Sequence, residues 1–125
     1  MIIRDLGKVD YLTGWQEMID FTKKRDQTTE DEFWICEHPP VFTLGTSLKN
    51  SILPIKGIPC INTDRGGKIT YHGPGQLVGY PLMDLRKNDL YPKELLELIN
   101  QMVLSVMRKF GVKGLLVRGP RNIRF

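Results

Sequence analysis

The sequence contains no run of about 18 apolar residues, the length that would indicate a membrane-spanning helix. Its first residues, MIIRDLGKVDY, lack the basic start and the uninterrupted apolar stretch of a secretory signal peptide. We therefore expect a cytoplasmic protein with no membrane span. The 125 residues are enough for one domain with its own core and too few for two of ordinary size.

Cysteine and histidine are scarce, with two of each in the chain. Cys36 and Cys60 have no further cysteine or histidine at the spacing of a zinc site. We interpret both as buried, reduced side chains and expect neither a metal nor another cofactor.

Basic charge is concentrated at one end of the chain. Arg118, Arg121 and Arg124 lie in the last eleven residues, LLVRGPRNIRF, and account for three of the four net positive charges. A nucleic-acid interface needs basic residues gathered on one face. We therefore interpret residues 115–125 as a solvated basic tail and expect no nucleic-acid partner. A protein that binds nucleic acid through this tail is the alternative that we rank last.

Two segments show helical spacing of apolar residues. The first is YLTGWQEMIDFTKKR, Tyr11 to Arg25, with its basic residues at the C-terminal end. The second begins at Pro92, and Gly111 stands where a helix C′ glycine is expected. Its spacing predicts one core-facing stripe, made of Leu95, Ile99, Met102, Val106 and Phe110.

Between these helices the pattern predicts short strands with a loop among them. We expect a loop from Thr46 to Gly57, a turn at Gly66-Gly67, and a hairpin of the strands on either side of that turn. Pro81 indicates a strand end or a sheet edge. The order of elements predicts an α/β fold of the α+β type, a mixed sheet with flanking helices. The expected strands are FWICEH, VFTLG, IPCINTD, KITYH and QLVGYPLMDL.

Glycine and polar residues are densest in DRGGKITYHGPGQL, Asp64 to Leu77. A dinucleotide site is disfavoured because no helix follows its glycines. Period-two geometry in KITYH places Lys68, Thr70 and His72 on one face, opposite Ile69 and Tyr71. The stretch is therefore either a ligand-pocket wall, with backbone N–H groups at Gly73 and Gly75 able to meet an oxyanion, or an ordinary hairpin and turn.

Nucleophilic residues have unfavourable surroundings in this sequence. Cys36 lies among apolar residues and beside Glu37, a setting that raises a thiol pKa. Cys60 is a candidate only if His72 or Lys68 lies beside it. His38, in EHPP, is expected to hold a turn together rather than to titrate in a mechanism.

Two long motifs carry a family resemblance. EHPPVFTLG, Glu37 to Gly45, and DRGGKITYHGPGQLVGYP, Asp64 to Pro81, followed by MDL, resemble the octanoyltransferases of lipoate synthesis, also called lipoate-protein ligase B. The resemblance covers Leu6 to about Val112. It implies a fold similar to the biotin and lipoate protein ligase catalytic domain.

The resemblance also implies an activity and its partners. The family transfers an octanoyl group from acyl carrier protein to a lysine of lipoyl domains in oxoacid dehydrogenases and in the H protein of the glycine cleavage system. In the family, the segment that corresponds to residues 65–72 of this chain lines the acyl-substrate pocket. The resemblance therefore implies a substrate-binding set of Arg65, Gly66, Gly67, Lys68, Ile69, Thr70, Tyr71 and His72.

The family's catalytic lysine and its acyl-accepting cysteine lie in motifs that these residues do not contain. We therefore expect residues 1–114 to be the N-terminal part of a single acyltransferase domain, with the C-terminal part missing and 115–125 as a divergent basic tail. No catalytic residue is assigned, and the chain alone is expected to be inactive. An exposed sheet edge and apolar face should then favour self-association. The alternative is a non-catalytic acyl-binding or carrier-docking module.

Overall fold

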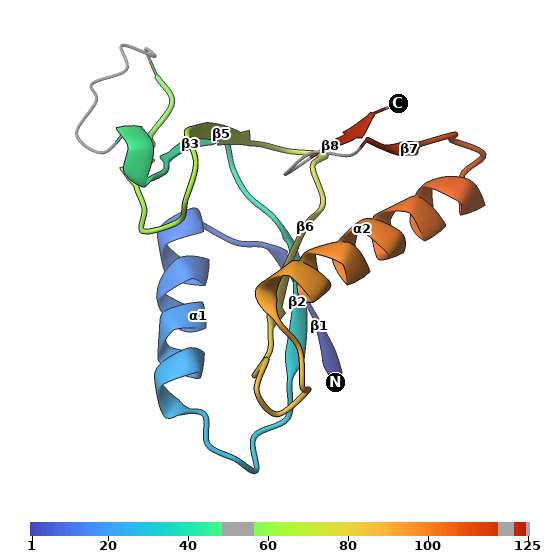
Figure 1. Cartoon of the computed structure of the whole chain (residues 1–125). Helices are drawn as coiled ribbons and strands as arrows, with labels where there is room; N and C mark the ends of the chain where they lie inside the picture. The colour runs from blue at the N-terminus through green and yellow to red at the C-terminus, as the bar shows by residue number, and fades with distance from the viewer. Residues whose placement is uncertain (49–56, 118–121, 125) are drawn as a thin grey trace. The chain divides into compact units, whose positions relative to one another are not determined.

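The computed structural model describes residues 1–48, 57–117 and 122–124. The chain divides into two compact units, Met1–Met83 (unit 1) and Asp84–Phe125 (unit 2). Within these residues, unit 1 contains one α-helix, a short 3₁₀ helix and two three-stranded sheets, and unit 2 contains one long α-helix and a two-stranded ladder (Figure 1). The predicted α/β class with mixed sheets is confirmed, although two small sheets replace the single expected one.

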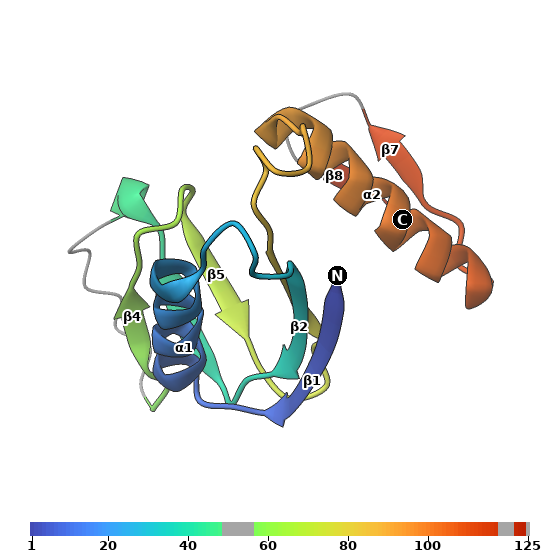
Figure 2. The ribbon, with the colours of Figure 1, turned by 90° about the horizontal axis from the view of Figure 1, so that it is seen from below.

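The first sheet of unit 1 has the order β1-β2-β6, formed by Ile2–Lys8, Glu32–Glu37 and Val78–Leu82. β2 runs parallel to β1 and antiparallel to β6, so the sheet is mixed. Pro81 lies in β6, an edge strand among the described residues, as its lack of an N–H donor predicts. Strand β1 was not predicted from the sequence, and it lies beside β2 in Figure 2.

The second sheet has the order β4-β3-β5, formed by Cys60–Asn62, Val41–Leu44 and Ile69–His72. β3 pairs parallel with β4 and antiparallel with β5. The predicted hairpin of β4 with β5 is therefore wrong, because β3 lies between them. β3 is the central strand of this sheet, and its residues Val41, Thr43 and Leu44 are buried.

Helix α1, Tyr11–Lys24, confirms the first helix prediction. Its N-cap is Asp10, whose carboxylate accepts the Thr13 N–H at 3.2 Å. Phe21 packs edge-on against Trp34 of β2, with ring centroids 5.9 Å apart. This contact and the burial of Tyr11 place the core of unit 1 between α1 and the strands.

The connection from α1 to β2 is closed by an ion pair. Arg25 and Asp31, both largely buried, have an N–O distance of 2.6 Å, and Arg25 also donates to the Leu82 carbonyl of β6. The Arg25 guanidinium thus connects the end of α1 to the start of β2 and to β6.

The segment from Thr46 to Gly57, expected to be a loop, begins with a short 3₁₀ turn, Thr46–Leu48. Residues 49–56 of this expected loop lie outside the described residues.

In unit 2, helix α2 covers Pro92–Lys109 and confirms the second helix prediction. The Glu94 carboxylate accepts the Tyr91 N–H at 2.7 Å, and Gly111 has φ +72°, as a C′ glycine does. The predicted core stripe is only partly correct. Leu95 and Ile99 are half-buried, but the three later members are exposed, namely Met102, Val106 and Phe110.

The segment interpreted as a basic tail has backbone structure of its own. β7, Leu115–Val117, pairs antiparallel with β8, Asn122–Arg124. No helix within the described ranges is long and apolar enough to cross a membrane.

Candidate functional site

The turn before β5 is held to β3 by Arg65. Its Nη2 donates to the Thr43 carbonyl at 2.7 Å, to the Thr43 hydroxyl at 3.0 Å and to the Lys68 carbonyl at 3.0 Å. Its Nη1 donates to the Gly66 carbonyl at 3.1 Å. Arg65, predicted to bind substrate, thus uses its guanidinium to fix the turn in place.

Gly45 lies directly against this turn. Its N–H donates to the Lys68 carbonyl at 2.8 Å, and the next N–H, of Thr46, donates to the Arg65 carbonyl at 3.0 Å. A Cβ on Gly45 would collide with the backbone carbonyl of Gly67. Gly67 itself has φ +93°, which glycine adopts at little cost. The close packing of the two segments therefore requires both glycines.

Strand β5 alternates in burial as predicted. Ile69 is 39% exposed and Tyr71 43% exposed, whereas Thr70 and His72 are half-buried. Thr70 pairs with Thr43 and His72 with Val41, two buried residues of β3. The polar face of β5 is therefore the inward one, and Lys68 lies before the strand.

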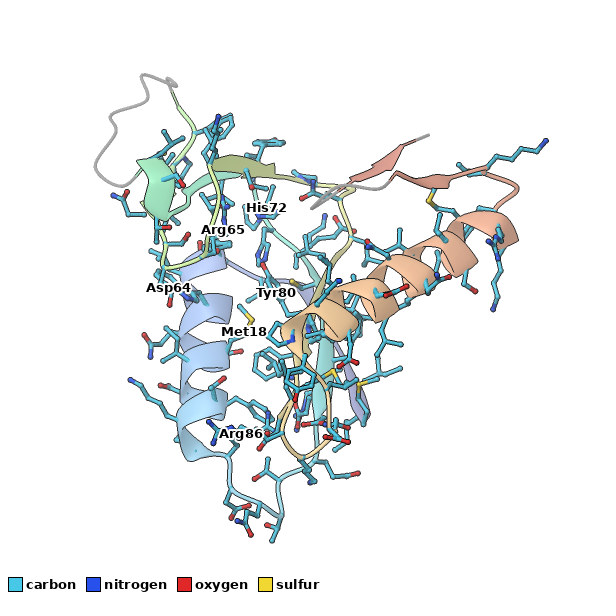
Figure 3. The ribbon with its side chains drawn as sticks, in the orientation of Figure 1. Met18, Asp64, Arg65, His72, Tyr80 and Arg86 are labelled. Carbon is cyan, nitrogen blue, oxygen red and sulfur yellow. The ribbon has the colours of Figure 1, made fainter. Side chains whose placement is uncertain are left out.

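Two tyrosines and two histidines meet inside unit 1, and we call Tyr11, His38, His72 and Tyr80 the Tyr–His cluster. The Tyr11 ring stacks on His72 at a centroid distance of 5.9 Å and 16° between planes. His38 packs edge-on against both, at 5.2 Å from Tyr11 and 5.7 Å from His72. Figure 3 shows His72 and Tyr80 between α1 and the strands.

His38 anchors the cluster. It is 1% exposed, and its Nδ1 lies 2.8 Å from the Val9 carbonyl, which can only accept, so Nδ1 carries a proton. Its Nε2 lies 2.8 Å from the Tyr80 hydroxyl. Burial raises the pKa of Tyr80, which keeps this hydroxyl protonated and able to donate. The expectation that His38 has a structural role is consistent with these contacts.

His72 differs from His38 in its partners. Its Nδ1 lies 2.8 Å from Oε1 of Gln76. Burial lowers the pKa of His72, with His38 and Arg65 acting in the same direction and the Gln76 contact opposing them. The ring is therefore mostly neutral near pH 7.

The turn after β5 contradicts one expectation for its glycines. The Gly75 N–H donates to the Glu37 carboxylate at 2.9 Å. The Gly75 N–H, which was expected to be available to an oxyanion, is therefore already bonded to the Glu37 carboxylate. Glu37 instead connects the end of β2 to the turn Gly73-Pro74-Gly75, the Gly-Pro-Gly turn.

The two thiols differ in their surroundings. Cys36 Sγ lies 3.5 Å from His38 Nε2, whose closer partner is the Tyr80 hydroxyl. Cys36 is buried, and its pKa is raised by burial and by Asp5, which confirms the predicted direction. Cys60 is exposed, so its predicted burial is wrong. It lies in register with Phe42 and Tyr71, on the face of the sheet opposite His72 and with β3 between them. The condition for activating Cys60 through His72 is therefore not met.

Four residues of the site were not predicted from the sequence. No group of three or more metal-ligating side chains occurs in the part of the chain that the structure describes. Glu37, Gln76 and Tyr80 lie within the two long motifs, and that position was the available signal in the sequence. Tyr11 lies at the start of α1, outside both motifs.

Sequence comparison finds curated relatives that match most of this chain. Curated proteins named octanoyltransferase resemble the chain, from Saccharophagus degradans (50% identical over 111 residues, covering 88% of this chain and 51% of the relative) and Laribacter hongkongensis (48% over 123 residues, 98% and 58%). That of Vesicomyosocius okutanii is 44% identical over 124 residues, covering 98% of this chain and 61% of the relative. The chain spans about half the length of the curated relatives it matches.

The family match covers both motifs, the Tyr–His cluster and α2. Residues 10–122 match the family described as the lipoyl protein ligase A/B catalytic domain. Because this match extends over most of the chain, the protein belongs to the lipoyl protein ligase A/B catalytic domain family.

Proposed function

We propose that this chain forms the acyl-binding wall of a cytoplasmic octanoyltransferase of lipoate biosynthesis. The reaction is transfer of an octanoyl group from octanoyl-acyl carrier protein to a lysine of lipoyl domains, in oxoacid dehydrogenases and in the glycine cleavage H protein. The observation that carries the proposal is the Tyr–His cluster inside a chain similar to octanoyltransferases. The domain boundary at residue 114 stays a prediction.

The geometry refines the predicted substrate-binding set. Thr70 and His72 face inward on β5, and His72 meets Tyr11 of α1. Ile69 and Tyr71 point to the opposite face of the sheet. We therefore assign ligand contact to His72 with Thr70. Arg65, Gly66, Gly67 and Lys68 act by shaping the turn that sets the position of β5.

The cluster suits the polar end of an acyl thioester. Its aromatic rings offer apolar surface to the chain of the acyl group, and its ring nitrogens and hydroxyls offer hydrogen bonds. Burial raises the pKa of the Cys36 thiol, and Cys60 lies on the face of its sheet opposite His72. We therefore expect these 125 residues to bind an octanoyl donor without forming an acyl-enzyme.

Binding tests this function. Titration of octanoyl-acyl carrier protein into the chain should give saturable binding, and His72→Ala should weaken it at least about tenfold, since a buried polar contact to the ligand is lost. Ile69→Ala is the matched control on the same strand, because Ile69 faces away from His72. Absence of binding, or equal losses in the two variants, would contradict the proposal.

A second assay separates binding from chemistry. Octanoyl transfer to a lipoyl domain is followed with the same donor, and an adduct on the chain is sought by mass spectrometry before and after hydroxylamine. We expect binding without turnover or adduct, the behaviour of the acyl-binding module considered above. A hydroxylamine-cleavable octanoyl adduct on Cys36 or Cys60 would refute the expectation that neither thiol is a nucleophile.

A further inference from the structure

Gln76, an exposed side chain in the turn after β5, uses both atoms of its amide in contacts beside His72. Its Nε2 donates to the Tyr71 carbonyl at 3.4 Å, and its Oε1 lies 2.8 Å from His72 Nδ1. The first contact requires the amide nitrogen to point at Tyr71, because a carbonyl can only accept. The amide oxygen is then the atom that faces the imidazole.

This orientation decides which His72 nitrogen carries the proton. An amide oxygen cannot donate, so Nδ1 must be the donor in the 2.8 Å contact. In a neutral ring the other nitrogen, Nε2, then has a free lone pair. The tautomer is thus set by a side chain four residues further along, at the end of the Gly-Pro-Gly turn.

Burial is the main reason that the pKa of His72 is lowered, and His38 and Arg65 act in the same direction, so the neutral ring is favoured. Tyr11 stacks on it from α1, His38 meets it edge-on from the end of β2, and Arg65 contributes a positive charge from the turn before β5. The contacts of His72 to Tyr11 and His38 are ring contacts, so they leave the proton position to Gln76.

We propose that Gln76 is a positioning residue, which holds His72 in the Nδ1–H tautomer so that the unprotonated Nε2 can accept a hydrogen bond from an N–H or O–H group of the carrier-linked acyl donor, since the thioester itself has no hydrogen to donate. The assignment of the ligand rests on the proposed function. The assignment of the tautomer rests on the contacts of Gln76 and can be tested without any ligand.

The test is nitrogen NMR of the chain labelled with ¹⁵N-histidine, which has two histidines and therefore a simple spectrum. In the wild type we expect His72 to show a protonated Nδ1 and an unprotonated Nε2 above its pKa. Gln76→Leu removes the acceptor and should shift the ring toward the Nε2–H tautomer. Gln101→Leu, at an exposed position of α2, is the matched control and should leave the His72 signals unchanged.

Gln76→Glu provides a second variant that keeps an acceptor. The Nδ1–H tautomer should persist, and the His72 pKa should rise by about one unit because a carboxylate favours the charged ring. A wild-type ring protonated at Nε2, or an unchanged tautomer in Gln76→Leu, would overturn the proposal. A role of Gln76 confined to folding predicts no selective change of the His72 signals in either variant.

Ligand binding links the tautomer to function. Gln76→Leu should weaken binding of octanoyl-acyl carrier protein several-fold, and Gln76→Glu should retain more affinity above the raised pKa than below it. If the wild type fails to bind the octanoyl donor, the proposed function fails while the NMR result still decides the tautomer. If the wild type binds and Gln76→Leu binds equally well with an altered tautomer, the positioning role is refuted.

Discussion

At Gly45 the chain passes so close to the turn before β5 that a side chain does not fit. The position where a Cβ would lie is occupied by the backbone carbonyl of Gly67, and Arg65 O lies 3.1 Å from it. Backbone atoms cannot rotate away as the end of a flexible side chain can. Relief of the collision would require the whole turn to move away from β3.

We predict that Gly45→Ala lowers the free energy of unfolding by about 1–3 kcal/mol, the usual cost of forcing extra atoms into a packed site. Chemical denaturation measures the change. Gly66→Ala is the control, since a Cβ there meets no atom within 4 Å and its φ is not in the left-handed region. A smaller loss at position 45 than at position 66 would refute the close approach.

At the scale of elements, β1 is attached to β2 by a charged contact as well as by backbone pairing. Arg4 of β1 donates to the Glu32 carboxylate at 2.7 Å, and the indole N–H of Trp34 donates to the other carboxylate oxygen at 2.6 Å. Glu32 is buried, while Arg4 is exposed. The hydrogen bond from Arg4, with help from Trp34, lowers the pKa of Glu32 against the opposing effect of burial.

The pH dependence of stability follows from this shift. Because the folded-state pKa of Glu32 lies below its unfolded value of about 4.5, its stabilising contribution is complete above that value and is lost as pH falls through the folded pKa. Urea denaturation from pH 7 to pH 3 should show a decline in unfolding free energy below about pH 5 that is shallower in Glu32→Gln. Glu30→Gln, at an exposed position nearby, should follow the wild-type curve, and identical slopes in all three proteins would contradict the assignment to Glu32.

At the scale of the whole molecule, α2 carries apolar side chains that the described residues leave in solvent. Met102 is 43% exposed, Val106 50% and Phe110 81%. They continue the stripe that begins with the half-buried Leu95 and Ile99. Apolar residues gathered at helical spacing on one exposed face favour association.

We predict that the isolated chain self-associates through this face. The double variant Met102→Glu and Val106→Glu should reduce association measured by light scattering at a given protein concentration, since it places charge in the apolar stripe. The double variant Gln101→Glu and Ser105→Glu adds the same charge at adjacent exposed positions of the helix and serves as its control. Equal reduction in both variants would show that net charge, rather than the apolar face, governs association.

Much of the local structure could be predicted from the sequence because its causes are local. Helical spacing gave both helices, Gly111 gave the end of the second, and Pro81 gave an edge strand. The strands of the wrongly predicted hairpin were recognised individually, but their pairing depended on a third strand earlier in the chain. β1 was missed because the backbone pairs and the Arg4–Glu32 contact that attach it involve residues some 30 positions later in the chain.

The candidate site divides in the same way. The alternation along β5 and the unfavourable setting of Cys36 were both visible in the sequence. The exposure of Cys60 could not be predicted, because it depends on how β4 pairs with β3. The structural role of Arg65 could not be predicted either, because it depends on which backbone carbonyls lie around its guanidinium.

The sequence by itself determined both helices, the strands between them, the family motifs and the raised pKa of the Cys36 thiol, because these follow from residue spacing, turn chemistry and the identity of neighbours in the chain. Only the tertiary structure decided that α1, β2, β5 and β6 bring Tyr11, His38, His72 and Tyr80 together, and that Gln76 faces His72. The physical reason is that burial and hydrogen-bond geometry belong to pairs of groups distant in the chain, so they exist only once the strands have paired and the helix has packed.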